Sequence, residues 1–249
     1  WLWAMKRRAD ELLTESGLAD SIEKARALIM AGEVLWGTKR IDKAGQTLPA
    51  DAVLSVKGKE HPWVSRGGLK LVKGLDFFGI SPAGKICMDV GCSTGGFTDV
   101  LLSRGAEKVY AIDVGYGQLA QKLRVDSKVV VLERTNARHL TSKEIPEPVD
   151  MIVCDASFIG LRSVLPVPME FAANGAKLVA LIKPQFEVPK HLVGEGGIGC
   201  DEALAKEVCD VIYDWLSNMP GWSVLGITSS PIKGQEGNIE FLIAAEKKS

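Results

Sequence analysis

From Ile86 onward, short apolar runs alternate with helical patterns, and this alternation restricts the possible fold more than any other feature of the sequence. The expected strands are Ile86–Val90, Val109–Ile112, Val129–Leu132, Met151–Cys154, Leu178–Ile182, Val224–Thr228 and Ile239–Ala244. The expected helices between them are Thr98–Ser103, Gly160–Ala173 and Glu202–Leu216. Strands that alternate with helices indicate a parallel α/β sheet, in which ligands bind at the carboxyl ends of the strands.

Small residues fill the loop after the first expected strand, where the sequence from Met88 to Phe97 reads MDVGCSTGGF. Small side chains let a ligand approach the backbone closely. The candidate ligand-binding residues here are Asp89, Gly91, Ser93, Thr94, Gly95, Gly96 and Phe97. Asp113, which ends the second expected strand, suits a ribose diol, and Asn136, after the third, is placed to meet an adenine edge. The alternative is a plain structural turn.

The spacing of the glycines narrows the choice of nucleoside cofactor. The loop has G-x-x-x-G-G rather than the dinucleotide pattern G-x-G-x-x-G, and the chain contains no G-x-x-x-x-G-K-[ST]. A carboxylate just before the loop would repel a pyrophosphate. It would suit the cationic sulfonium and amino group of S-adenosylmethionine, which is the cofactor we expect.

Two further strand ends carry charged residues that a packed core would not favour. Asp155 follows the fourth expected strand and Lys183 follows the fifth. A buried Lys beside an Asp costs desolvation energy unless the two are paired, so a purely structural ion pair is one interpretation. The functional interpretation is a positioned pair that faces the cofactor methyl group. No N-P-P-Y motif or Pro-Cys dipeptide is present, so attack by a hydroxyl group fits better than methylation of a base.

The segment up to about Lys59 has a different pattern, with two short helices and short strands. Arg8 opens the first helix, and Asp20 is expected to cap a second helix that Gly32 ends. The strands are expected at Val34–Trp36 and at 53–56. The segment is rich in basic side chains that share a face or form an ordinary solvated surface, and the candidates for RNA binding are Arg7, Arg8, Lys24, Arg26, Lys39 and Arg40.

The first segment resembles the S4 RNA-binding domain, through R-x-x-E-L-L from Arg8, G-L-A-D-S-x-x-x-A from Gly17 and I-M-A-G-x-V from Ile29. The rest resembles the TlyA/haemolysin A family, through S-R-G-G-x-K-L from Ser65, D-V-G-x-S-T-G-G-F from Asp89 and K-P-Q-F-E from Lys183. The resemblance implies a Rossmann-like S-adenosylmethionine-dependent methyltransferase sheet, an α/β fold, behind a small α+β S4 domain. The implied bounds are 6–59 for the S4 domain, 60–64 for a linker and 65–249 for an FtsJ-like methyltransferase domain.

This resemblance also implies an activity, the 2′-O-methylation of cytidine in ribosomal RNA, with ribosomal subunits as partners. Lys70, Asp155, Lys183 and Glu240 match the Lys-Asp-Lys-Glu tetrad of FtsJ-like ribose methyltransferases. Lys183 would assist removal of the 2′-hydroxyl proton, as a base if its pKa is depressed and electrostatically otherwise. Asp155 would hold Lys183, and Lys70 and Glu240 would orient the ribose. Ser65 and Arg66 are further RNA-binding candidates. After Glu187 the chain departs from the family pattern, with Cys200 where Arg is common, and the loop 188–199 is a candidate lid.

The net charge, the cysteines and histidines, and the length of the apolar runs argue against several classes of function. The formal net charge is −1, so any RNA affinity must come from a local patch. Five cysteines without a C-x-x-C, and three histidines without ligand spacing, predict buried free thiols in a reducing cytoplasm and no metal site. No apolar run approaches the length of a membrane span, so no membrane partner is expected. Two other functions stay open: a membrane-active haemolysin, and a non-catalytic RNA-binding or ribosome assembly factor.

Overall fold

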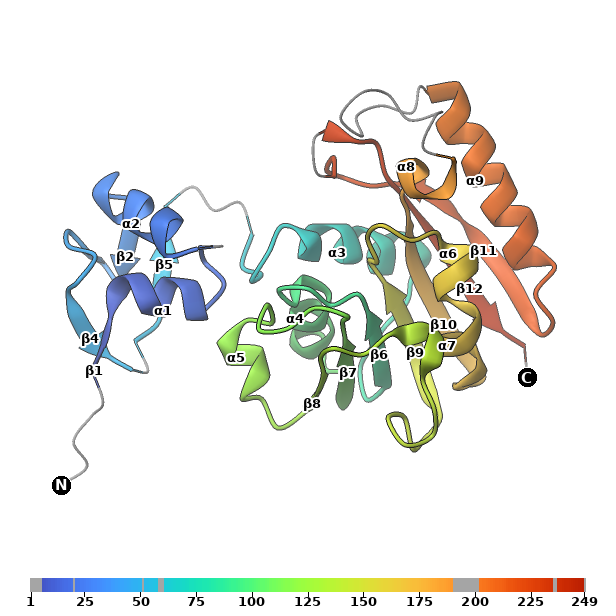
Figure 1. Ribbon diagram of the computed structural model, residues 1–249, viewed down its shortest axis with the longest axis horizontal. Coiled ribbons are helices and arrows are strands. Elements are labelled where there is room, and N and C mark those ends of the chain that lie inside the picture. Colours follow the sequence, from blue (N-terminus) through green and yellow to red (C-terminus); the bar gives the residue numbers. More distant parts are fainter. Residues whose placement is uncertain are drawn as a thin grey trace.

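The computed structural model describes residues 6–19, 21–50, 52–57, 61–189, 202–234 and 237–248. These residues form two parts, a small N-terminal part that contains α1 and α2 and a larger part built around one sheet (Figure 1). Within the described residues, no helix has both the length and the apolar character needed to cross a membrane.

The N-terminal part packs two helices against short strands. Its elements are β1 (Lys6–Arg8), α1 (Ala9–Glu15), α2 (Ile22–Met30), β2 (Val34–Trp36), β3 (Lys39–Arg40), β4 (Thr47–Pro49) and β5 (Leu54–Val56). β1 pairs with β4, and β2 lies between β3 and β5, all antiparallel. Leu13, Ile29, Val34 and Ile41 are among the residues of its own buried core.

The cap of α2 differs from the prediction. Ser21, not Asp20, is the N-cap residue, and its hydroxyl accepts a hydrogen bond from the Lys24 N–H at 3.2 Å. Ser21 has an extended backbone, which lets its side chain turn back to the exposed amides of the first turn. Asp20 itself lies outside the described residues.

The larger part begins with a helix and continues as alternating strands and helices. Its elements are α3 (Gly67–Phe78), β6 (Ile86–Val90), α4 (Gly96–Ser103), β7 (Lys108–Ile112), α5 (Gln121–Arg124), β8 (Val129–Leu132), the 3-10 helix η1 (Ala137–His139), β9 (Val149–Cys154), α6 (Leu161–Val164), α7 (Pro166–Glu170), β10 (Ala172–Ile182), α8 (Pro184–Glu187), α9 (Glu202–Ser217), β11 (Trp222–Ser229) and β12 (Phe241–Lys247).

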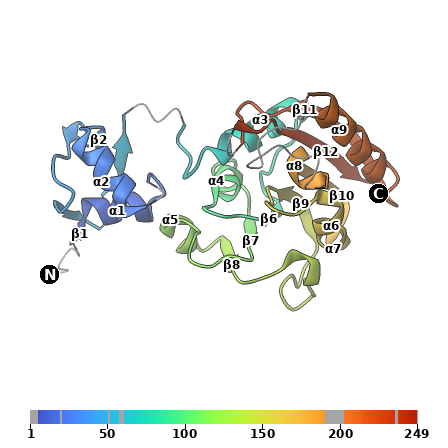
Figure 2. The same ribbon diagram turned by 45° about the horizontal axis from the view of Figure 1, so that its top comes forward.

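The strands form a seven-stranded sheet in the order β11-β12-β10-β9-β6-β7-β8. The five strands from β10 to β8 are parallel, as expected, but β12 is antiparallel to both of its neighbours. The order reverses at β6, because the chain first builds outward through β7 and β8 and then returns to add β9 and β10 (Figure 2). Such a switch point opens a crevice at the carboxyl ends of the strands.

Each face of the sheet has its own apolar core. Met88 and Val90 of β6 point into a cluster that includes residues of α6, α7 and α9, whereas Cys87 points into a second cluster with α3 and α4. Side chains of a strand alternate between its faces, so strands covered on both sides are apolar throughout. This is why the strand runs were visible in the sequence. Cys87, Cys92, Cys154 and Cys209 are buried free thiols, as predicted for the first three, and Cys200 lies outside the described residues.

One expected helix, Gly160–Ala173, was wrong. The chain forms two short helices, α6 and α7, and Ala172 already belongs to β10. Pro166 stands at the first position of α7. A proline has no N–H to donate and restricts the residue before it, so it starts a new helix rather than continuing the old one.

The segment between the two parts is fixed to the sheet domain. The Val64 N–H donates to the Asp99 carboxylate at 2.9 Å, and Val64 is buried with Leu119, Ala120 and Leu123 of the α5 region. Val64 also packs against Gly17 of the N-terminal part, at the point where a Cβ on Gly17 would lie 2.8 Å from the Val64 Cβ. The two parts therefore meet close to the small-residue loop.

Candidate active site

Two cavities that adjoin the loop after β6 also reach Asp155, at the end of β9. The first, of about 520 Å³, lies along the carboxyl ends of β6, β7 and β8 and is lined by Gly91, Ser93, Asp113, Asn136 and Asp155, among others. The second, of about 620 Å³, lies between the two parts of the chain. Gly91, Ser93 and Asp155 line both cavities. A group bound in one cavity would therefore meet a group bound in the other at these three residues.

The loop needs its glycine at the start of the turn. Gly91 has a φ of +79°, and a Cβ built there would lie 2.8 Å from the Cα of Ala156. Any side chain at Gly91 would thus push apart the ends of β6 and β9. Gly95 has a φ of +99° and packs against Leu119 and Leu123 rather than lining either cavity.

Asp113 organises the loop of the first cavity. Its two carboxylate oxygens accept hydrogen bonds from the Ser93 N–H at 2.8 Å and the Gly115 N–H at 2.7 Å. A carboxylate has about four acceptor positions, so capacity remains for a ribose diol. Asn136 caps η1 by accepting from the Arg138 N–H at 3.1 Å. Asp113 and Asn136 line the same cavity as Gly91 and Ser93.

Asp89 lies behind the loop rather than in a cavity wall. It is fully buried, and one carboxylate oxygen accepts a hydrogen bond from the Thr98 hydroxyl at 2.7 Å, which ties β6 to α4. Burial, with a smaller effect of the charges on Asp155 and Asp113, raises the pKa of Asp89 to about 7. The residue therefore anchors the loop from beneath.

The second cavity is bounded by the start of α3 and by the N-terminal part. Thr94, Gly96 and Phe97 line it from the loop, and Ser65, Arg66 and Lys70 line it from α3 and the residues before it. Leu28, Glu33 and Lys57 line the opposite side. α3 and α4 approach so closely here that a Cβ on Gly96 would lie 2.9 Å from the Gly68 nitrogen of α3, and 2.3 Å from the hydroxyl oxygen of Ser65 just before it.

Four charged residues form two ion pairs near the junction of the cavities. The Lys183 Nζ lies 2.6 Å from an Asp155 carboxylate oxygen, and the Lys70 Nζ lies 2.6 Å from a Glu240 carboxylate oxygen. Lys70, Lys183 and Glu240 are buried. Glu240 directly precedes β12 and does not lie within it, which corrects its expected place in the last strand. Buried charges are tolerated only when they are paired, so each lysine is held by its acid.

Two further residues, which the sequence did not single out as site residues, support the segments that carry the Lys183–Asp155 pair. The Ser157 hydroxyl lies 3.0 Å from the Lys183 Nζ, so Lys183 contacts Ser157 as well as Asp155. The Glu187 carboxylate accepts a hydrogen bond from the Leu161 N–H at 2.6 Å, which joins the loop after β9 to α8. Their positions in D-A-S-F and K-P-Q-F-E, each within a few residues of Asp155 or Lys183, were the available signal.

The predicted RNA-binding residues are interleaved with acids. Arg7 pairs with Glu11 and Glu15, Arg40 pairs with Asp42 at 2.9 Å, and Arg8 and Arg26 both pair with Asp10. Lys24 and Lys39 are exposed. Among the described residues, no group of three or more His, Cys, Asp or Glu side chains is arranged to hold a metal ion.

A sheet of this order, with a small-residue loop after its central strand and an acid at the end of the next, defines a Rossmann-like methyltransferase domain. The FtsJ-like methyltransferase family matches residues 63–247, and the S4 domain family matches residues 7–54. The chain belongs to the FtsJ-like methyltransferase family and carries an S4 domain ahead of the catalytic domain.

Relatives with both parts are found in several bacteria. The 16S/23S rRNA (cytidine-2′-O)-methyltransferase TlyA of Mycobacterium tuberculosis is 47% identical over 247 residues, which cover 96% of this chain and 90% of that protein. Hemolysin A of Brachyspira hyodysenteriae is 41% identical, over 94% of this chain and 98% of that protein. A solved structure from Streptococcus thermophilus, described as a hemolysin, has a TM-score of 0.74 and 39% identity, covering 99% of this chain and 90% of that one.

Proposed function

We propose that this methyltransferase transfers the methyl group of S-adenosylmethionine to the 2′-hydroxyl of a cytidine ribose in ribosomal RNA, in the cytoplasm. The observation that carries the proposal is the junction of two cavities at Gly91, Ser93 and Asp155, with the Lys183–Asp155 ion pair beside it. The relatives described as rRNA (cytidine-2′-O)-methyltransferases supply the acceptor and the base.

The residues of the first cavity fit S-adenosylmethionine. Its volume of about 520 Å³ lies in the range of small-molecule sites, about 300–1,000 Å³. Asp113 would bind the ribose diol, Asn136 would meet the adenine edge, and the loop Gly91–Phe97 would hold the methionine portion, with Asp89 beneath it. When bound, S-adenosylmethionine supplies an electrophilic methyl group on a sulfonium.

The second cavity would take the acceptor nucleotide. One of its walls comes from the S4 domain, so RNA held by that domain would enter beside the reacting atoms. Methyl transfer is an in-line displacement, and alignment of the acceptor oxygen supplies much of its rate. Lys70, held by Glu240, would orient the ribose.

Lys183 would assist removal of the 2′-hydroxyl proton and stabilise the developing negative charge. Asp155 and Ser157 fix its ammonium group, so little reorganisation is needed at the moment of reaction. The four tetrad residues therefore act as two positioned ion pairs.

The first experiment is transfer of labelled methyl from S-adenosylmethionine to purified, unmodified small and large ribosomal subunits, with nuclease mapping of the product. We expect a 2′-O-methylated cytidine. Lys183→Ala should reduce transfer by at least about 100-fold, as expected for loss of a positioned proton-transfer group, and leave cofactor affinity nearly unchanged. Lys177→Ala is the matched control, because Lys177 lies on the same strand but pairs with Glu246 at 2.6 Å.

Full turnover by Lys183→Ala would remove Lys183 from the mechanism. No transfer to either subunit by the unaltered protein would contradict the proposed acceptor. Because two relatives are described as hemolysins, lysis of red cells by the purified protein is measured in parallel. Lysis that persists in Lys183→Ala, without cofactor, would favour the membrane-active alternative.

A further inference from the structure

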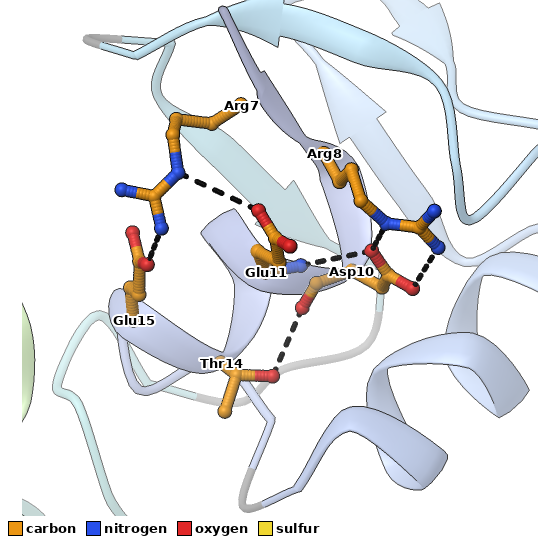
Figure 3. A network of polar contacts seen from close by, with 6 residues as sticks. All are labelled: Arg7, Arg8, Asp10, Glu11, Thr14 and Glu15. Carbon is orange, nitrogen blue, oxygen red and sulfur yellow. Dashed lines mark hydrogen bonds and ion pairs between the residues drawn. The ribbon is translucent and has the colours of Figure 1, made fainter.

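One acid of the S4 domain lies in a different environment from the others. The Asp10 side chain is 1% exposed, although it stands in the first turn of α1 and binds two arginines. Its oxygens accept hydrogen bonds from Arg8 Nε at 3.0 Å, from an Arg8 terminal nitrogen at 2.8 Å and from Arg26 Nε at 3.0 Å. Figure 3 shows Arg8 reaching Asp10 with two parallel bonds.

The two arginines come from separate elements and remain accessible. Arg8 lies on β1 and Arg26 on α2, and their side chains are 44% and 52% exposed. The pair of guanidinium groups and the single carboxylate carry a net charge of +1. One buried carboxylate thus holds two outward-facing guanidinium groups at a fixed distance from each other, a geometry that suits phosphate oxygens.

Asp10 is itself fixed by the backbone. Its N–H donates to the Ala44 carbonyl at 3.1 Å, and its carbonyl accepts from the Thr14 hydroxyl at 2.9 Å. The hydrogen bond from Arg8, which outweighs the opposing effect of burial, and a weaker effect of the Arg26 hydrogen bond lower the pKa of Asp10 to about 2. The carboxylate is therefore ionised across the neutral pH range.

The other arginine pairs of the domain lack this arrangement. Asp42, the partner of Arg40, is 69% exposed, and the partners of Arg7 are 41% and 33% exposed. Exposed pairs of this kind exchange readily with water and contribute little. Asp10 is distinct because it is buried and the arginines bound to it are not.

We propose that Asp10 is a positioning residue for RNA binding, which holds Arg8 and Arg26 as a preformed pair for the phosphate backbone. The inference rests on the proposed function, because it requires that ribosomal RNA is the acceptor. Long arginine side chains lose rotamer freedom on binding, and prior fixation removes that cost. The acid thus strengthens binding of a polyanion although it carries the same sign of charge.

Asp10→Asn separates this role from simple charge compensation. Charge compensation predicts tighter RNA binding, because the variant gains one positive charge. Positioning predicts binding of an rRNA fragment weaker by about tenfold or more, and a salt dependence reduced by one to two phosphate contacts. Asp42→Asn is the matched control, with the same charge change at an exposed pair. In methyl transfer, Asp10→Asn should raise KM for RNA and leave kcat and cofactor affinity unchanged.

A second variant covers the case in which Asp10→Asn unfolds the S4 domain. Arg8→Lys combined with Arg26→Lys keeps Asp10 and both charges but removes the two-pronged geometry, and it should weaken RNA binding in the same way. Two results would overturn the inference: RNA binding by Asp10→Asn that is as tight as, or tighter than, binding by Asp42→Asn, and unchanged RNA binding by the double lysine variant. If the unaltered protein still methylates RNA, the proposed function stands in either case. Absence of both binding and methylation in the unaltered protein would overturn both.

Discussion

Asp89 is a fully buried carboxyl, and its burial should make the free energy of unfolding depend on pH. Burial raises its folded-state pKa from 3.8 to about 7, whereas the unfolded chain ionises near 3.8. Between these values the unfolded state binds fewer protons than the folded state. The free energy of unfolding should therefore fall as the pH rises through this window.

Asp89→Asn tests this directly, because the amide can still accept the hydrogen bond from Thr98. We expect the variant to gain on the order of 1–3 kcal/mol relative to the unaltered protein at pH 7.5 and to show no such gain at pH 4. Thermal melting across the range measures it, with Asp210→Asn at an exposed position as the control. Parallel curves for the two proteins would mean that Asp89 is ionised in the folded state.

The position of an individual site residue could be predicted from the sequence where that residue directly follows a strand. Asp113, Asp155 and Lys183 each directly follow a buried apolar run, so their position at the sheet edge was visible in the sequence. Lys70 and Glu240 were found only through the family resemblance. Their ion pair joins residues 170 positions apart, and no local pattern encodes such a distance.

At the scale of elements, Glu187 connects the two segments that carry the Lys183–Asp155 pair. It ends α8, and its carboxylate accepts the N–H of Leu161 at the start of α6. Burial raises the pKa of Glu187 above its ordinary value. We expect Glu187→Ala to lower the free energy of unfolding by about 1–3 kcal/mol, since a buried N–H loses its acceptor.

The same variant should lower the rate of methyl transfer, because the loop from Asp155 to Gly160 loses an attachment. Glu187→Gln keeps an acceptor oxygen and should retain most of both properties. Glu170→Ala, at the exposed end of α7, is the control. Urea titration and single-turnover methyl transfer give the two readouts, and equal losses in the Gln and Ala variants would contradict the role of the hydrogen bond.

The strands were predictable where apolar residues run together. β8 has the expected bounds because it is an uninterrupted apolar run, and β6 has them although Asp89 lies within it. β10 begins six residues earlier than expected, because Asn174 and Gly175 interrupt the apolar pattern; Gly175 has a φ of +77°, and the pairing with β9 is irregular between Ala172 and Lys177. The short elements α5, α8 and η1 were missed, since four residues or fewer carry no helical period. The candidate lid at 188–199 falls almost entirely outside the described residues.

At the scale of the whole molecule, the two domains contribute differently to the two cavities, and a deletion experiment tests this. The lining of the first cavity, which we propose for the cofactor, comes entirely from residues 91–164, whereas the second cavity has a wall from the S4 domain. Deletion of residues 1–59 should keep cofactor affinity within about threefold, a change below 1 kcal/mol. It should also weaken RNA binding and lower its salt dependence. Calorimetry and filter binding measure the two affinities, and unchanged RNA affinity would make the basic residues ordinary surface.

The antiparallel strand β12 lies inside the sheet, between β10 and β11, and the residue just before it is Glu240. The chain is synthesised from its N-terminus, so every residue that lines the first cavity leaves the ribosome before β12 does. Until β12 inserts, β10 keeps an open edge and Lys70 lacks its acid. The Lys70–Glu240 pair, and with it the full set of four charged residues, therefore forms only when the sheet closes around β12.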